Sequence, residues 1–180
     1  MIFKFVGALI IAAIVVIGVS TWRSSTNLQQ YNNPPISFKY PKDYHPQTKV
    51  KSAIHSTQQI KLGVQNPLSI IELNKETGAI IAANATKSPF LDMLEKNAGR
   101  TLPLTYPNYN KISSERIKIS NRDAALFKFS YTGKDKQTLL YVSFFIIPSG
   151  NDAYYLYVQS TDKGRWQNDS KKIQSSLKLS

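Results

Sequence analysis

The stretch that decides the fold is Leu139–Ile147, LLYVSFFII. Its alternate positions are apolar on both sides, because Tyr141 and Phe145 fall on one face and Val142 and Phe144 on the other. A strand that is apolar on both faces lies centrally in a sheet that is covered on both sides. The sequence therefore predicts a sheet with a packed layer against each face.

Neighbouring segments supply further strands. Alternating apolar residues predict strands at 113–120, 124–132 and 153–159, and short polar turns join each to the next. These segments and 139–147 form an antiparallel meander of four strands. An earlier group is expected at 36–40, with Pro41 ending it, near 51–61, and at 68–73.

Two helices are available to cover the sheet. Ser88-Pro89 is a helix start and Gly99 a plausible stop, with a loop expected over 100–110. Asp162 is a candidate N-cap for a C-terminal helix. The apolar face of that helix carries Trp166, Ser170, Ile173 and Leu177. The predicted fold class is α+β, an α/β/α sandwich with a central antiparallel sheet and helices on both faces, preceded by one N-terminal transmembrane helix.

The transmembrane prediction rests on Phe5–Trp22, which contains no charge. Eighteen helical residues span about 27 Å, close to the hydrocarbon thickness of a bilayer. The expected anchor residues are Phe5, Leu9, Ile10, Ile14, Val16, Ile17 and Trp22. The alternative is a signal peptide cleaved near Gly18-Val19-Ser20, which would release a secreted protein.

Three parts of the chain follow from this assignment. Residues 1–23 form the membrane anchor or uncleaved signal, 24–35 a polar tether, and 36–180 the domain. Both versions of the N-terminus place the domain outside the cytoplasm, with a single-pass protein in the cell membrane as the first expectation.

The chain is basic, with a formal net charge of +12. Besides Lys171-Lys172 it has no adjacent basic pair, so we expect no nucleic-acid surface. Binding of an anionic polymer or a lipid surface stays open as an alternative. The chain has no cysteine, which excludes disulfides and thiolate chemistry.

No catalytic pattern is present in the sequence. His45 and His55 are ten residues apart, and Asp92 and Glu95 share a helix face beside Lys96, typical of a solvated surface. Nucleophile elbows, phosphate loops and dinucleotide fingerprints are absent. We therefore expect no enzyme activity, metal, cofactor or small-molecule substrate. Tyr154, Tyr155 and Tyr157 form a candidate interaction surface, with Tyr154 opposite the other two.

Several segments together resemble the PsbP-like family. They are ISFKYPKDY (36–44), RDAALFKFSYT (122–132), TLLYVSFFIIPSGNDAYYLYVQST (138–161) and RWQNDSKKIQSSLKLS (165–180), in the family's order. The resemblance covers 35–180. It implies an α/β/α sandwich whose common activity is protein binding; photosynthetic members are extrinsic subunits that support the oxygen-evolving centre of photosystem II. Tyr44 stands where the family often has Trp, and 24–35 does not match the photosynthetic docking segment.

The expected function is a membrane-anchored, non-catalytic domain that binds a protein partner and aids assembly or stability of an envelope complex. A photosystem II accessory role is the expectation for a photosynthetic source.

Overall fold

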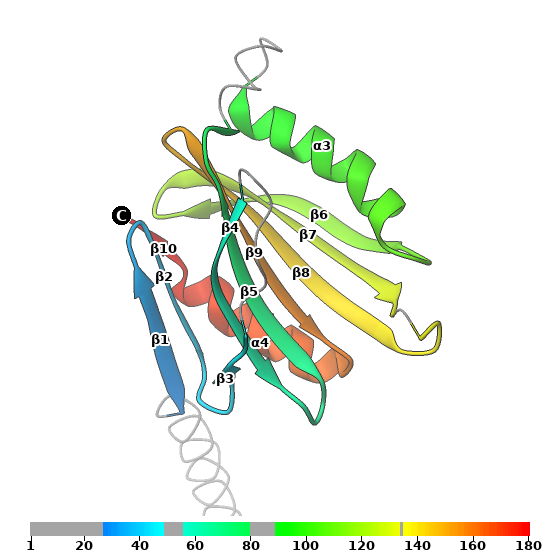
Figure 1. The fold of residues 1–180 in the computed structure, drawn as a ribbon. Coiled ribbons are helices and arrows are strands. Elements are labelled where there is room, and N and C mark those ends of the chain that lie inside the picture. The colour runs from blue at the N-terminus through cyan, green and yellow to red at the C-terminus, as the bar shows by residue number, and fades with distance from the viewer. Residues whose placement is uncertain (1–26, 49–55, 80–88, 134) are drawn as a thin grey trace, which may run out of the picture.

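The computed structural model describes residues 27–48, 56–79, 89–133 and 135–180. Within them, a seven-stranded antiparallel sheet has α3 against one face, and α4 with a three-stranded sheet against the other (Figure 1). The predicted transmembrane segment, Phe5–Trp22, lies outside the described residues. Neither described helix has the length and apolar character needed to cross a bilayer.

The elements follow one another in a simple order along the chain. They are β1 (Leu28–Asn33), β2 (Ile36–Pro41), β3 (His45–Pro46), β4 (Ser56–Val64), β5 (Ser69–Glu76), α3 (Phe90–Thr105), β6 (Asn110–Ile119), β7 (Arg122–Thr132), β8 (Leu139–Ser149), β9 (Asp152–Ser160), α4 (Lys163–Ser176) and β10 (Lys178–Leu179).

The large sheet has the strand order β3-β4-β5-β9-β8-β7-β6. The meander β6 to β9 is confirmed, and β8 lies between β7 and β9. Phe145 and Ile146, adjacent in β8, are both 0% exposed and belong to different apolar clusters. The prediction of a central strand covered on both faces is confirmed.

The apolar cluster beneath α4, called here the α4-side core, joins the two sheets. Its largest buried side chains include Tyr44, Phe38, Phe145, Ile71, Leu73 and Leu156. Ile173 of α4 is 0% exposed in the same cluster. The N-cap prediction is confirmed, because the Asp162 carboxylate accepts a hydrogen bond of 2.5 Å from the backbone N–H of Arg165.

The cluster beneath α3, called here the α3-side core, occupies the opposite face. It comprises Ala79, Leu91, Met93, Leu94, Ala98 and Leu102, with Ala125, Phe127, Phe129, Val142, Phe144, Ile146 and Ala153 from the sheet. Six half-buried aromatic residues pack around it, five of them tyrosines. This face therefore has a more polar and more open margin than the other.

The polar segment 24–35 is not a tether throughout. Leu28–Asn33 forms β1, which pairs with β2 in register, Tyr31 opposite Phe38. The two rings lie 5.1 Å apart between centroids. Only Leu28 and Tyr31 of β1 are half-buried, so the strand has too few apolar residues to show a period of two in the sequence.

The first helix is longer than predicted. It continues past Gly99 to Thr105, with Pro103 inside it, so most of the expected loop 100–110 is helical or belongs to β6. Leu102 is 5% exposed in the α3-side core, and this packing outweighs the poor helix propensity of Gly99. The predicted start is close, with Pro89 as the N-cap residue; Ser88 lies outside the described residues.

Candidate functional site

The space between α3 and the sheet holds the candidate site, called here the α3 cleft. It is a cavity of about 320 Å³. Its lining comes from α3 and its C-cap residue, from β8 and β9, and from the segment that ends β5. The lining residues are Glu76, Ala79, Met93, Leu94, Asn97, Ala98, Thr101, Leu102, Thr105, Tyr106, Phe144, Ile146, Tyr155 and Tyr157.

Two further hollows, of about 500 Å³ and 230 Å³, also have Tyr106 in their lining. Tyr106, the C-cap residue of α3, thus stands at the junction of three concavities. Its ring packs on Tyr131 at 4.6 Å and on Phe129 at 5.1 Å, which fixes its position over the sheet. The cleft and the two hollows therefore adjoin one another around Tyr106.

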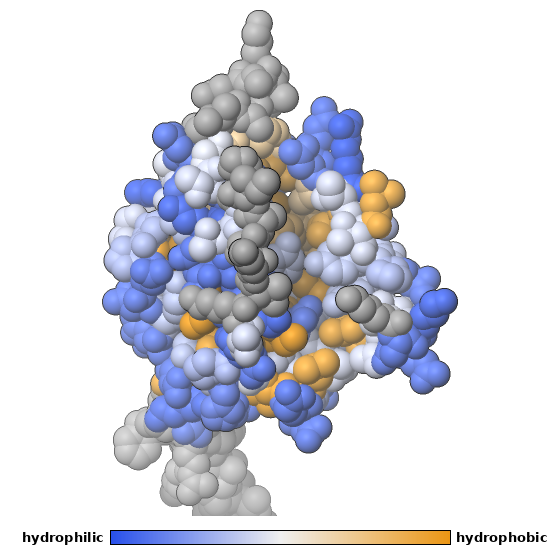
Figure 2. Space-filling view, viewed as in Figure 1, coloured by the Kyte–Doolittle hydropathy of each residue, from blue (hydrophilic) through white to orange (hydrophobic). Residues whose placement is uncertain are grey.

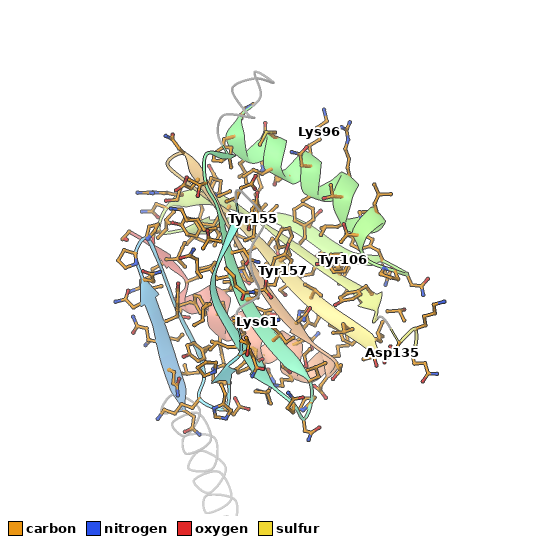
Figure 3. The ribbon with its side chains drawn as sticks, viewed as in Figure 1. Lys61, Lys96, Tyr106, Asp135, Tyr155 and Tyr157 are labelled. Carbon is orange, nitrogen blue, oxygen red and sulfur yellow. The ribbon has the colours of Figure 1, made fainter. Side chains whose placement is uncertain are left out.

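Stacked aromatic rings form the floor of the α3 cleft. Phe144 of β8 stacks on Tyr157 at 4.4 Å and on Tyr155 at 5.8 Å, with interplanar angles of 20° and 24°. Tyr155 and Tyr157 point to the same side because they are two residues apart in β9. Figure 3 shows both of them, with Tyr106, on the side of the sheet below α3, whereas Lys96 projects from the outer side of the helix.

The cleft tyrosines are held in their neutral form. The pKa of Tyr155 is raised, mainly by burial and in addition by the neighbouring Glu76. The Tyr155 hydroxyl donates a 2.6 Å hydrogen bond to the Glu76 carboxylate. Burial also raises the pKa of Tyr157 and raises the pKa of Tyr106 to about 12. The phenols therefore stay protonated at neutral pH and are not phenolate bases, and the single O–H of Tyr155 is already donated to Glu76.

The predicted tyrosine surface is divided by the sheet. Tyr155 and Tyr157 are half-buried in the α3 cleft, whereas Tyr154 is 6% exposed in the α4-side core. The Lys75 ammonium lies 5.8 Å from the Tyr154 ring centroid. A partner at the α3 cleft could contact two of the three residues, and whether any of them binds a partner stays a prediction.

The charged candidates are engaged in structural contacts. Asp92 and Glu95 both bind Arg116 of β6, with the Arg116 Nε atom 3.0 Å from Glu95 Oε2. This ion-pair cluster attaches the first turns of α3 to the edge of the sheet. His45 is exposed in β3, and His55 lies outside the described residues. Within the described ranges, no group of three or more His, Asp or Glu side chains is arranged to hold a metal.

Apolar side chains are exposed near the end of the cleft. Leu104 of α3 is 86% exposed, and Leu68, which lines the hollow of about 500 Å³ together with Tyr106, is 39% exposed. Figure 2 shows apolar patches interrupting a mainly hydrophilic surface on this side of the molecule. A leucine that exposed gains free energy when a partner covers it.

Sequence reasoning missed Tyr106, Glu76 and Phe144 as cleft residues. The Pro- and Tyr-rich run that contains Tyr106 was predicted to be a loop, although its composition marked it as unusual. Glu76 reaches Tyr155 only because β5 pairs with β9, a contact between residues 79 positions apart. No local pattern carries that information.

Comparison with known proteins gives structural but not sequence matches. No model of a protein family matches the sequence, and no curated protein matches it. The solution structure of cyanobacterial PsbP (CyanoP) from Synechocystis sp. PCC 6803 is similar with a TM-score of 0.53 and 10% identity, over 86% of this chain and 93% of that one. The chain has the PsbP-like fold.

Other structures share the PsbP-like fold at similar distance. LpqN of Mycobacterium tuberculosis, described as involved in cell envelope biogenesis, matches with a TM-score of 0.51 and 14% identity, over 90% of this chain and 96% of LpqN. A protein from Bacteroides thetaiotaomicron VPI-5482 matches with a TM-score of 0.51 and 15% identity, over 86% of this chain. The match covers 49% of that protein, so this chain spans about half of its length.

Proposed function

We propose that this PsbP-like domain is a non-catalytic module that binds a protein partner outside the cytoplasm and supports assembly or stability of an envelope complex. The apolar segment Phe5–Trp22 anchors it in the membrane as a single-pass protein. The involvement of LpqN in cell envelope biogenesis supports this location, by likeness of fold.

The α3 cleft is the observation that carries this proposal. Stacked aromatic rings, among them neutral tyrosines, line it, and the partly exposed Leu68 lines an adjoining hollow that shares Tyr106. Tyrosine is enriched at the energetic centres of protein interfaces because it combines a large apolar area with a hydrogen-bonding group. The occupant we infer is a segment of a partner protein that inserts apolar side chains into the α3 cleft and the two hollows that adjoin it at Tyr106.

Site-specific photocrosslinking in cells tests the proposal. A photoreactive residue at Thr101, which lines the cleft, should give a discrete adduct, whereas one at the exposed Lys39 on β2 should not. Adducts of equal yield from both positions would contradict a partner at the cleft.

Binding of the purified partner then provides the decisive measurement. Tyr157→Ala should weaken it by at least about tenfold, the effect of an interface hot spot. Tyr141→Ala is the matched control, because Tyr141 lies on β8 but faces α4. Unchanged affinity in the Tyr157→Ala protein would overturn the role of the cleft.

Binding of an anionic polymer or lipid surface is the second candidate, favoured by the net charge of +12. Such binding should weaken steeply as salt rises, because it depends on long-range charge. Absence of binding to anionic vesicles or polyphosphate at low salt would contradict it. A photosystem II accessory role stays a prediction for a photosynthetic source.

A further inference from the structure

A second cavity lies on the opposite face of the sheet, between α4 and the strands β6, β7 and β8. It has a volume of about 800 Å³ and is called here the α4 groove. Because α4 packs over β8 and β9, it leaves the β6 side of this face uncovered. The groove residues used below are Lys128, Tyr141, Ser143, Lys163, Trp166, Ser170 and Lys171.

Three buried polar groups on the groove wall lack partners. They are the indole N–H of Trp166 and the hydroxyls of Ser143 and Ser170, in residues that are 3%, 0% and 4% exposed. In the part of the chain that the structure describes, none of the three atoms has a hydrogen-bond partner, and only two further buried side-chain atoms share that condition. A buried polar group without a partner is destabilising, so three on one cavity wall require an explanation.

The charge of the groove is positive. Lys128, Lys163 and Lys171 line it, and its lining contains no carboxylate. Lys128 is partly neutralised, since its ammonium lies 3.2 Å from Glu115. Lys163 and Lys171 are eight residues apart on α4, about two helical turns along the wall, and neither forms an ion pair with another residue in the described ranges. An anion entering the groove would pass between them.

The groove also has an aromatic and apolar component. Tyr141 stacks on Trp166 with ring centroids 5.6 Å apart, and the Lys163 ammonium lies 5.9 Å from the Tyr141 centroid. Ile112 and Leu139 line the groove and are each 45% exposed. The volume falls in the range of small-molecule sites, about 300–1,000 Å³, and exceeds what a bare inorganic anion fills.

We propose that the α4 groove binds an organic phosphate, with the phosphate held by Lys163, Lys171 and the unpartnered N–H and O–H groups of Trp166, Ser143 and Ser170. Lysine is a common phosphate ligand that acts as a point charge, and the hydroxyl and indole donors add directed hydrogen bonds to the phosphate oxygens. The organic part of the ligand lies against Tyr141, Ile112 and Leu139. This site is separate from the α3 cleft, because the sheet lies between them.

Calorimetric titration of the full chain in a non-ionic detergent with sn-glycerol 3-phosphate tests the site. We expect saturable binding, and no binding of glycerol. Lys163→Gln combined with Lys171→Gln should weaken binding by at least about tenfold, as expected for loss of charged hydrogen bonds. Lys39→Gln combined with Lys178→Gln removes the same charge from exposed positions in β2 and β10 and should retain the affinity. Equal losses in both proteins would overturn the site.

The serine hydroxyls provide a test with two opposite readouts. Ser143→Ala combined with Ser170→Ala removes two unsatisfied groups, so the ligand-free protein should melt at the same or a higher temperature. The same protein should bind sn-glycerol 3-phosphate at least about threefold more weakly. A protein that binds as tightly as the wild type would show that the hydroxyls do not contact the ligand and would overturn the proposal.

An experiment with lipid vesicles distinguishes a lipid headgroup from a soluble phosphate ester as the ligand. The full chain is reconstituted in vesicles of phosphatidylcholine alone or mixed equally with phosphatidylglycerol, and Trp166 fluorescence is recorded in a Trp22→Phe background. A spectral change with phosphatidylglycerol that is abolished by Lys163→Gln with Lys171→Gln identifies a lipid headgroup. Binding of sn-glycerol 3-phosphate without this change identifies a soluble phosphate ester. Absence of both responses overturns the proposal.

Discussion

The two faces of β8 and β9 differ in how completely they are closed. On the α4 side, Phe145 and Leu156 are 0% exposed beneath a helix and a second sheet. On the α3 side, the neighbouring Tyr155 and Tyr157 are half-buried and line a cavity of about 320 Å³. Beneath α4 the same two strands supply a closed core, with the α4 groove beside it toward β6, and beneath α3 they supply an open aromatic cleft.

The helices account for the difference. The N-terminus of α4 is capped by the Asp162 side chain, and the helix packs against β2, β8 and β9. The N-terminus of α3 has no side-chain cap, and the helix packs chiefly on β7 and β8. An element with fewer buried contacts opens more easily, so α3 should open more readily than α4, although each face of the sheet carries a cavity.

Phe38→Ala is expected to have the largest effect on stability. Phe38 is 1% exposed where the small sheet meets the α4-side core, so truncation leaves a large cavity. We expect a loss of about 3–5 kcal/mol in the free energy of unfolding, measured by denaturant titration. A variant as stable as the wild type would place β2 outside the cooperative core.

A matched pair of leucine truncations compares the two faces directly. Leu156→Ala in the α4-side core should cost about 4 kcal/mol, near the upper part of the range for such changes. Leu94→Ala should cost about 2 kcal/mol, because Leu94 already borders the α3 cleft and loses fewer contacts. Chemical denaturation of both proteins checks the difference; equal costs would mean that the α3 side is packed as tightly as the other.

The smallest expected effect is on how the stability of the fold varies with pH when Asp169 is replaced. Tyr44 donates a 2.8 Å hydrogen bond to this buried carboxylate, and Arg165 Nε lies 3.3 Å from the same oxygen. Burial raises the pKa of Asp169 above its ordinary value of 3.8. The stability due to this shift is therefore full below the unfolded pKa and is lost as pH rises through the folded pKa.

Asp169→Asn removes the loss of stability at higher pH, because the amide does not ionise. The stability of the variant relative to the wild type should rise as pH increases from about 4 through the folded pKa of Asp169, and thermal melting at each pH measures this. Asp123→Asn should instead lose stability relative to the wild type as pH rises toward about 4, since a hydrogen bond and the charge of Lys118 lower the pKa of Asp123. Parallel pH curves for the wild type and Asp169→Asn would show that Asp169 has an ordinary pKa.

The parts predicted from the sequence were those with strong local patterns. Leu139–Ile147 indicated the covered central strand, and Asp162 indicated the start of α4. The missed parts depend on tertiary contacts. β1 is held by pairing with β2, and β10 by pairing of Leu179 with Ile36, which no local periodicity reveals.

The candidate site could be predicted only in part from the sequence, because the rest of it depends on tertiary contacts. Tyr155 and Tyr157 were recognised as a possible surface, but the cleft depends on where α3 lies and on Tyr106 at its end. The sequence contains only one local indication of the α4 groove. Ser143 is the one polar side chain in the otherwise apolar run LLYVSFFII, and a buried hydroxyl at that position requires a partner.

The pairing of β2 with the C-terminal residues of the chain has a consequence during synthesis. The backbone N–H of Lys39 bonds to the Ser176 side chain, 137 residues later, and β10 pairs with β2 just beyond. At a translation rate of about 5–20 residues per second, β2 emerges roughly 10–30 seconds before these partners exist. Throughout that interval Ile36, Phe38 and Tyr40 lack their final cover. The nascent chain is therefore most prone to aggregation through its first strands, and a holding chaperone would act there.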